Sequence, residues 1–201
     1  MNTTTEKIAC ILMASGLSER YGRNKLLEPL EGRALLLRTA DSLRAAGFAP
    51  VAVTRNETIK NLLDREGFSC VLHDGPKKSD TMHAGIRNTD PDAVGYLFMP
   101  GDQPLVRPAS LRRMAERFQA CPDRAVRLGY GETPGSPVLF PAFCREALLA
   151  YTGDRGGMDV IRGERIPCDS VQAEAAWELW DADTPERMEA IRRVFRRIKQ
   201  D

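Results

Sequence analysis

The sequence predicts an α/β fold of three layers, in which a doubly wound, mainly parallel sheet lies between two layers of helices. Short apolar runs alternate with segments of helical periodicity along the first 120 residues. This alternation is typical of parallel sheets, whose strands are covered by helices on both faces. Two of the apolar runs, 8–13 and 94–99, lead into turns that contain glycine and charged residues. Ligands bind at such strand ends in sheets of this kind.

The strands are expected where apolar residues run together, and the helices where apolar residues recur at three- and four-residue steps. In the first helix Leu36, Ala40 and Leu43 share one face, while Arg38 lies on another. Pro108 suits the first turn of a later helix. The expected strands are 8–13, 51–54, 69–72 and 94–99, and the expected helices are 34–46, 57–66, 79–88, 108–120 and 184–199.

The composition changes near residue 128, where the doubly wound core is expected to end. Glycine and proline are frequent from 129 to 163, with apolar residues interleaved. We expect long, shaped loops there, which would form the acceptor side of a cleft. The segment 177–183 is expected as a strand that leads into the last helix.

Length and charge narrow the class of protein. A chain of 201 residues suits one domain, with parts expected at about 8–128, 129–183 and 184–199. Lys and Arg number 29 against 28 for Asp and Glu, so the net charge of +1 gives no general affinity for nucleic acid or for a membrane surface. No apolar run approaches the roughly 20 residues that a membrane span needs. We therefore expect neither a nucleic-acid partner nor a membrane partner.

The cysteines and histidines argue against disulfides and zinc. Five cysteines are an odd number, and none belongs to a C-x-x-C pair, which favours reduced thiols. The first residues are polar and precede no apolar signal core, so we expect a cytoplasmic protein. His73 and His83 form no i, i+4 pair of the kind that binds zinc.

A loop suited to phosphate follows the first strand. Ala14, Ser15 and Gly16 are small enough for their backbone N–H groups to approach an anion, and Arg20 and Lys25 add two cations. One triphosphate would satisfy all of them. The spacing fits neither a Walker A loop nor a dinucleotide fingerprint, and an ordinary glycine-containing loop is the alternative.

A second motif, Gly101-Asp-Gln-Pro104, follows the apolar run 94–99. Asp102 is expected to point into the same crevice as the phosphate loop, because ligands lie outside the carboxyl ends of parallel strands. A carboxylate beside a phosphate chain requires a cation between them, and Mg²⁺ takes one or two carboxylates together with phosphate oxygens and water. An ordinary turn is the alternative for this tetrapeptide.

A third motif places Asp181 and Asp183 two residues apart, before Thr184 and Pro185. On a strand they would share one face, and one of them would complete the metal site. We expect that ligand to be Asp183. The alternative is that Asp183 or Thr184 only caps the following helix, a role worth ~1 kcal/mol.

The three motifs, in this order and at about this spacing, resemble those of the nucleotidyltransferases that build molybdopterin dinucleotide cofactors. The resemblance runs from about Ile8 to Met188 and is closest to the cytidylyltransferase branch. The segment Gly135-Ser-Pro-Val-Leu-Phe140 resembles that branch's Gly-x-Pro-x-x-Phe, and Thr152-Gly-Asp-Arg-Gly-Gly157 resembles its Gly-Asp-x-Gly on the pterin side. The resemblance implies a Rossmann-like fold of the nucleotide-diphospho-sugar transferase type.

The resemblance also implies a set of site residues. Lys25, Arg20 and Asp102 would act in catalysis, and Asp102 and Asp183 would bind Mg²⁺. Contacts with nucleotide or cofactor are implied for Met13, Ala14, Ser15, Gly16, Ser79, Thr81, Gly85, Gly101, Gly135, Pro137, Gly153 and Asp154.

Four positions depart from the pattern of the family. Ser15 stands where the cytidylyl enzymes usually have Ala and the guanylyl enzymes Gly, at the position associated with base choice. Tyr21 replaces Met or Phe, Ser136 replaces Asn, and Thr81 replaces Ser, so a hydroxyl is retained at position 81.

The implied reaction is transfer of CMP from CTP to the terminal phosphate of molybdopterin, with release of pyrophosphate. A molybdenum hydroxylase would then receive the product. Alternatives are a GTP-using guanylyltransferase, or transfer to a sugar phosphate or methylerythritol phosphate. A further alternative is a nucleotide- or cofactor-binding maturation factor without activity, against which the paired metal carboxylates argue.

Overall fold

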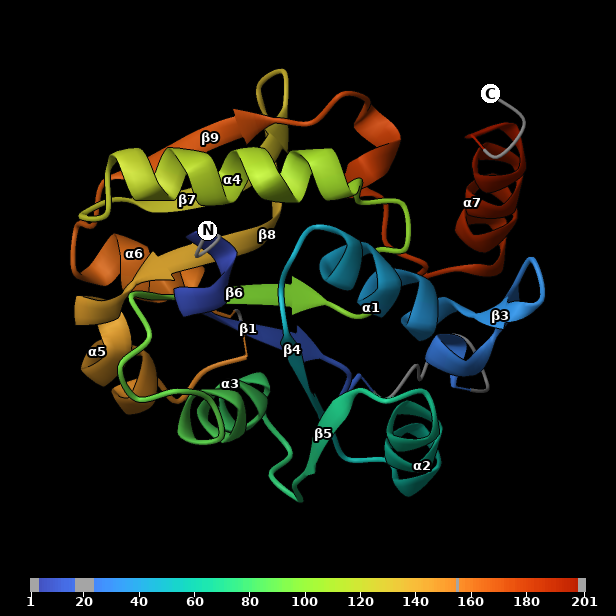
Figure 1. Ribbon diagram of the computed structural model, residues 1–201, viewed down its shortest axis with the longest axis horizontal. Coiled ribbons are helices and arrows are strands. Elements are labelled where there is room, and N and C mark those ends of the chain that lie inside the picture. Colours follow the sequence, from blue (N-terminus) through green and yellow to red (C-terminus); the bar gives the residue numbers. More distant parts are fainter. Residues whose placement is uncertain (1–3, 17–23, 155, 199–201) are drawn as a thin grey trace.

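The computed structural model describes residues 4–16, 24–154 and 156–198, which fold around one seven-stranded sheet (Figure 1). The strand order is β5-β4-β1-β6-β8-β7-β9. The strands are β1 (Ile8–Met13), β4 (Pro50–Thr54), β5 (Ser69–Leu72), β6 (Gly95–Pro100), β7 (Ala125–Tyr130), β8 (Thr133–Pro141) and β9 (Cys168–Gln172), and a separate small hairpin pairs β2 (Pro29–Leu30) with β3 (Arg33–Ala34).

The helices connect these strands and lie on both faces of the sheet. The α-helices are α1 (Leu35–Ala45), α2 (Glu57–Arg65), α3 (Lys78–Arg87), α4 (Pro108–Ala120), α5 (Arg145–Ala150), α6 (Met158–Gly163) and α7 (Pro185–Ile198). Short 3-10 turns are η1 (Thr4–Lys7), η3 (Lys25–Leu27), η4 (Ala142–Cys144) and η5 (Ala176–Leu179). In the part of the chain described by the structure, no helix is both long and apolar enough to cross a membrane.

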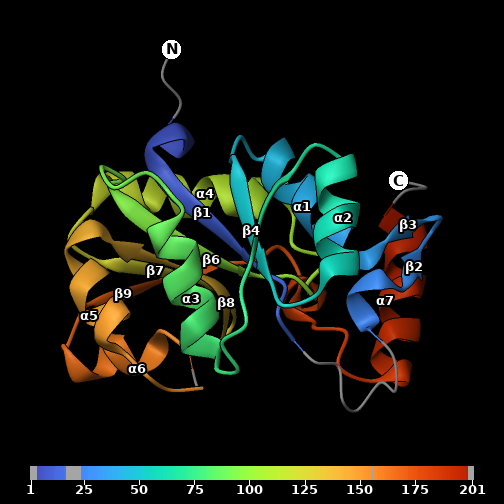
Figure 2. The same cartoon turned by 90° about the horizontal axis from the view of Figure 1, so that it is seen from below.

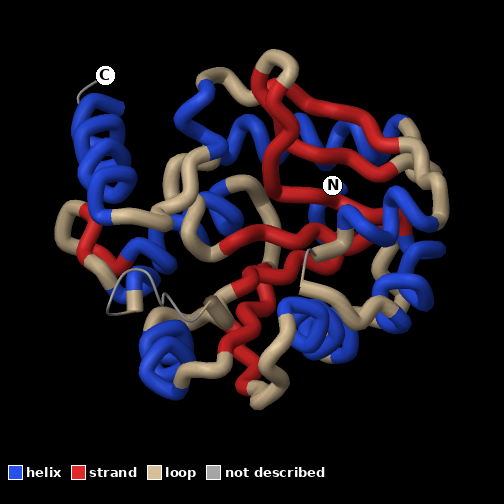
Figure 3. Tube along the Cα trace, turned by 180° about the vertical axis from the view of Figure 1, so that it is seen from behind, coloured by secondary structure: helices blue, strands red, loops and turns tan. Residues whose placement is uncertain are grey.

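Alternate residues of β1 show how the two apolar layers arise. Cys10 and Leu12 face a core formed with helices α1, α2, α4 and α7, whereas Ala9 and Ile11 face a second core formed with α3, α5 and α6. Figure 2 shows these helices from below, and Figure 3 follows the strands from behind. The three-layer architecture predicted from the sequence is confirmed.

The predicted strands and helices of the first 120 residues agree with the structure to within one residue at each end. The strands β5, β4, β1 and β6 are mutually parallel, as expected. The sheet continues beyond the expected end of the doubly wound core near residue 128, because β7, β8 and β9 extend it. Strand β8 is antiparallel to both β6 and β7.

Two further expectations are corrected. The segment 129–163 is not mainly loop, because its apolar residues let β8 pair with a strand on each side, and α5 and α6 follow. The segment 177–183 is not a strand, because it begins within the 3-10 turn η5 and then runs on without regular structure to α7. Tertiary contacts therefore override the local pattern in both segments.

The five cysteines are free thiols. Cys10 and Cys144 are buried and the other three are partly buried. Burial raises the pKa of the Cys70 and Cys144 thiols to about 11, so both remain protonated at neutral pH. These features fit the predicted reduced thiols.

Candidate active site

A pocket of about 540 Å³ opens at the carboxyl ends of the parallel strands. Its volume lies in the usual range for small-molecule sites. The structure brings seven of the predicted site residues to its walls. They are Met13, Ser15, Gly16, Lys25, Thr81, Asp102 and Asp183.

The start of the predicted phosphate loop is fixed to the end of β4. The Ala14 N–H donates to the Val53 carbonyl (2.8 Å), and the Thr54 hydroxyl donates to the Ala14 carbonyl (2.9 Å). The Arg55 guanidinium donates to the Ser15 carbonyl (3.1 Å). A Cβ placed on Gly16 would meet no described atom within 4 Å, so its backbone faces open space. The predicted phosphate ligand Arg20 lies outside the described residues.

The turn that carries Asp102 is packed tightly against the core. The Gly101 N–H donates to the Met13 carbonyl (2.9 Å), and the Thr39 hydroxyl donates to the Gly101 carbonyl (3.0 Å). A Cβ on Gly101 would lie 2.8 Å from a Leu36 methyl and 2.9 Å from the Met13 oxygen. Only glycine allows this approach, and it directs the Asp102 carboxylate into the pocket. The tetrapeptide is thus a turn that also contributes a pocket side chain.

Asp183 reaches the pocket on an irregular arm. The Ala182 N–H donates to the Asp102 carbonyl (3.1 Å), which holds the arm beside the Asp102 turn. Thr184 accepts a hydrogen bond from the Arg187 N–H (3.2 Å) and so caps α7. The cap predicted as an alternative role is therefore made by Thr184, while Asp183 faces the pocket.

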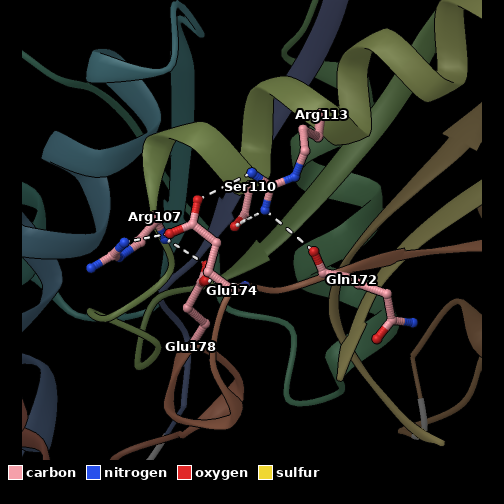
Figure 4. A network of polar contacts seen from close by, with 6 residues as sticks. All are labelled: Arg107, Ser110, Arg113, Gln172, Glu174 and Glu178. Atoms are coloured by element: carbon pink, nitrogen blue, oxygen red, sulfur yellow. Dashed lines mark hydrogen bonds and ion pairs between the residues drawn. The ribbon is translucent and has the colours of Figure 1, made fainter. Parts of the chain in front are cut away.

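The arm is anchored by Glu178, which has no exposed surface. Its two carboxylate oxygens accept from the backbone N–H groups of Arg107 (3.0 Å) and Glu174 (2.8 Å). The Glu174 carboxylate in turn binds the guanidinium groups of Arg107 and Arg113 (Figure 4). Glu178 therefore joins the arm to the first turn of α4.

Lys25 lies between the two pocket carboxylates. Its Nζ donates to Asp102 Oδ2 (2.5 Å) and to Asp183 Oδ1. Burial lowers the pKa of Lys25, but the Asp102 and Asp183 carboxylates outweigh that effect and hold the pKa above its ordinary value. Lys25 is thus a cation at neutral pH and neutralises part of the carboxylate charge.

Asp181 does not share this arrangement. Its pKa is raised by burial and then by the negative charges of Asp183 and Asp102. The structure gives Asp183, and not Asp181, the ion pair with Lys25.

The carboxylates suit a divalent cation that brings further ligands with it. Asp102 and Asp183 converge on one cationic nitrogen, so both reach a common point. Within the described ranges no three His, Cys, Asp or Glu side chains converge to hold a metal on their own. Two carboxylates completed by phosphate oxygens and water are the usual ligands of Mg²⁺ at nucleotide sites. The residues present therefore fit such an ion when a nucleotide accompanies it.

Eight predicted residues do not line the pocket: Ala14, Ser79, Gly85, Gly101, Gly135, Pro137, Gly153 and Asp154. Several make packing or backbone contacts. A Cβ on Gly85 would lie 2.5 Å from Ile11, and the Gly153 carbonyl and Asp154 carboxylate accept from the N–H groups of Ser79 and Lys78 at the start of α3.

Sequence reasoning missed an apolar wall of the pocket. Met82, Phe98, Val138, Phe140 and Met158 line it. The Phe98 and Phe140 rings meet edge to face with centroids 5.6 Å apart. Phe98 and Phe140 alternate with residues that are buried in the other core, such as Leu97 and Leu139, so recognising the wall required knowledge that β8 pairs with β6.

Sequence reasoning also missed three cationic residues of the pocket, which are Arg55, Lys77 and Lys78. Arg55 follows β4, and Lys77 and Lys78 stand at the start of α3, the helix that also carries Met82 of the apolar wall. Lysines at the start of a helix carry no sequence signal that separates them from ordinary surface residues.

A parallel sheet whose strand ends present a loop of small residues and two carboxylates is typical of enzymes that bind a nucleotide together with a divalent cation. Residues 10–175 match the family described as the MobA-like NTP transferase domain. The match covers most of the chain, and the protein therefore belongs to this family and is a nucleotidyltransferase.

Similar proteins agree with this assignment. The Bacillus subtilis purine catabolism protein PucB is 24% identical over 199 residues, covering 92% of this chain and 96% of that protein. A 3-deoxy-manno-octulosonate cytidylyltransferase from Koribacter versatilis is 27% identical over 138 residues, covering 67% of this chain and 50% of that protein.

Solved structures share the fold. Rv0371c from Mycobacterium tuberculosis superposes with a TM-score of 0.83 at 24% identity, covering 94% of this chain and 99% of that chain. The same mycobacterial protein has been solved in complex with manganese, with a TM-score of 0.78 at 23% identity over 92% of this chain and 98% of that chain.

Proposed function

We propose that the protein transfers CMP from CTP to the terminal phosphate of molybdopterin and releases pyrophosphate. The observation that carries the proposal is the cluster of Lys25, Asp102 and Asp183. It lies at the carboxyl ends of β1 and β6, in a pocket with an apolar wall. The resemblance of the motifs to molybdopterin cytidylyltransferases gives the two substrates. We further propose that a molybdenum hydroxylase receives the product.

The reaction needs charge neutralisation more than proton transfer. A phosphate monoester has a second pKa of about 6, so the acceptor is already a nucleophile at neutral pH. One of its oxygens forms a bond to the α-phosphorus of CTP, and the bond from that phosphorus to the bridging oxygen of pyrophosphate breaks. Catalysis then depends on positioning and on the stabilisation of added negative charge.

The residues of this chain divide that work. The backbone N–H groups of Ser15 and Gly16 bind phosphate oxygens, and Lys25 pairs with the charge that develops at the α-phosphate. A bound Mg²⁺ would be held by Asp102 and Asp183 and would neutralise the phosphate charge. Lys25 pairs with both carboxylates, so it would have to turn toward the phosphates when these carboxylates hold a cation.

The apolar wall favours a flat ring system as the acceptor. A sugar phosphate presents several hydroxyl groups, and each needs a hydrogen-bond partner when it is buried. Phe98, Val138, Phe140 and the two methionines of the wall offer no such partners through their side chains. A fused pterin ring can instead stack or pack against these surfaces.

A pyrophosphate-release assay tests the proposal. CTP, GTP and ATP are each combined with molybdopterin, a simple sugar phosphate or 3-deoxy-manno-octulosonate, and Asp102→Asn serves as the inactive control. We expect release with CTP and molybdopterin and only background release with the other acceptors. Faster release with a sugar acceptor would overturn the molybdopterin assignment and would favour a sugar-acid cytidylyltransferase, as the Koribacter relative is named.

A further inference from the structure

A polar network lies behind the end of the pocket formed by β5, β4 and β1. His73 follows β5, and its Nε2 lies 2.8 Å from the Ser15 hydroxyl and 3.1 Å from the Thr81 hydroxyl. The Ser15 hydroxyl also donates to the Val53 carbonyl (3.2 Å). Ser15 and Thr81 line the pocket, whereas His73 contacts them from behind. This network links the segment after β1 to the end of β4 and to residues 73–81.

The other ring nitrogen of His73 determines the direction of these hydrogen bonds. Nδ1 is buried and has no hydrogen-bond partner among the described residues. Orphaned buried N–H groups are rare, whereas an unsatisfied acceptor is tolerated more often, so the proton belongs on Nε2. The pKa of His73 is lowered by burial and by the Arg55 cation, against the opposing charges of Asp80 and Asp74, which keeps the ring neutral.

This tautomer fixes both hydroxyl groups. The Nε2–H of His73 donates to Ser15, whose own proton is committed to Val53, so Ser15 presents only lone-pair density to the pocket. The same N–H also donates to Thr81, over a longer distance, so that the hydrogen bond is bifurcated. The Thr81 O–H is then available as a donor. At this end of the pocket, Ser15 is therefore a hydrogen-bond acceptor and Thr81 a hydrogen-bond donor.

The position of these groups identifies what they contact. Ser15 follows β1 and meets His73 beyond the neighbouring β4, whereas Phe98, Val138 and Phe140 of the apolar wall lie on β6 and β8, on the other side of β1 in the sheet. With the phosphates at the centre and the acceptor against the wall, the nucleotide base extends toward Ser15 and Thr81. This placement rests on the proposed nucleotidyltransferase reaction.

We propose that His73 is a positioning residue for base selection, which orients Ser15 as an acceptor and Thr81 as a donor and so favours cytosine over uracil. Cytosine has an amino donor next to a ring-nitrogen acceptor, and uracil has a carbonyl acceptor next to an N–H donor. The two bases have nearly the same size but the reverse order of hydrogen-bonding groups. Uracil would set its carbonyl acceptor against the acceptor Ser15, and its ring N–H could not accept the Thr81 proton.

The network is not a nucleophile with its base, although a serine lies beside a histidine. Such pairs need a third group that orients the histidine, and none of the described residues hydrogen bonds to His73 Nδ1. The Ser15 proton is directed to a backbone carbonyl.

The test compares His73→Gln with His73→Met. The amide nitrogen of Gln can reach the place of Nε2 and donate to Ser15, whereas Met fills a similar volume without a donor. The affinities for CTP and UTP are measured with Mg²⁺ and without acceptor, so the result does not depend on which acceptor the protein uses. We expect the wild-type preference for CTP to fall about tenfold in His73→Met and to stay within about threefold of wild type in His73→Gln, as expected for loss of one well-placed hydrogen bond.

A second measurement does not depend on variants that fold. The ¹⁵N shifts of His73 in the wild-type protein report which ring nitrogen carries the proton, and we expect Nε2. A proton on Nδ1, equal binding of CTP and UTP by wild type, or an unchanged preference in His73→Met would each overturn the inference. If GTP binds best while the CTP-to-UTP preference still falls in His73→Met, the inference stands and the proposed cytidylyltransferase function fails.

Discussion

The two carboxylates that bind Lys25 have very different supports. Asp102 extends from a turn that is hydrogen bonded to β1 and α1, and its side chain is 20% exposed. Asp183 ends an irregular arm that is anchored five residues earlier by buried Glu178, and its side chain is 50% exposed. Asp102 is thus held by the sheet, whereas Asp183 is held by a segment that is anchored separately, through Glu178. The site is assembled from two parts that can be perturbed one at a time.

The largest effect is expected at the fixed carboxylate. Asp102→Asn should lower Mg²⁺-dependent pyrophosphate release by on the order of 10³-fold, because a neutral amide cannot replace a metal-binding carboxylate. The change is nearly isosteric, so the thermal unfolding midpoint should move little. Wild-type turnover in this variant would show that Asp102 does not bind the metal.

The second-largest effect is expected on removal of Lys25, the cation that pairs with both carboxylates. Lys25→Ala should slow pyrophosphate release by on the order of 10²-fold, as expected for loss of a preorganised charge at a developing oxyanion. Lys25→Met should bind Mn²⁺ roughly tenfold more tightly than wild type in the absence of nucleotide, because no ammonium group then occupies the carboxylates. Electron paramagnetic resonance of free Mn²⁺ measures this affinity, and equal or weaker binding would contradict the exchange between Lys25 and the metal.

The support of Asp183 is tested by substituting its anchor, Glu178. Glu178→Gln replaces one of two acceptor oxygens by an NH₂ group that would face a backbone N–H, so the free energy of unfolding should fall by about 1–3 kcal/mol. Because the arm also positions Asp183, the Mg²⁺ concentration for half-maximal activity should rise. The matched control is Glu174→Gln, which weakens only the exposed ion pairs of the same network. Full additivity of Glu178→Gln with Asp183→Asn in metal affinity would mean that the anchor does not act through Asp183.

The smallest effect is expected at Ser15, which belongs to neither support and contacts β4 and His73 instead. Ser15 adds a side chain where a larger purine needs room, so CTP should exceed GTP in kcat/KM, and Ser15→Gly should narrow the gap by a few-fold. A wild-type preference for GTP would reject the cytidylyltransferase assignment and leave the predictions for the carboxylates intact.

The difference between the two supports also explains what the sequence could predict. Asp102 follows an apolar strand directly, and the end of a parallel strand is a known place for ligands, so local pattern was sufficient. The direction of Asp183 depends on Glu178, whose partners are backbone N–H groups of Arg107 and Glu174. Since any residue can supply those N–H groups, no side-chain pattern marks the contact.

The same reasoning applies to the second half of the sheet. Gly135 and Pro137 are typical of loops, yet β8 is a strand because both its neighbours pair with it. Similarly, His73 meets Ser15 only because β5 and β1 flank β4 in the sheet. The sequence therefore predicted the layers and the residues at strand ends, whereas contacts that depend on the order of strands required the structure.

The ion pairs of Lys25 with Asp102 and Asp183 also bear on how folding depends on divalent cations. Two neighbouring carboxylates repel each other, and many metalloproteins relieve such repulsion only when the metal arrives, so that folding depends on metal supply. Here the ammonium group of Lys25 offsets part of the negative charge of the pair. We therefore expect folding to depend little on divalent cations, so that a chelator should stop turnover while leaving the thermal unfolding midpoint nearly unchanged.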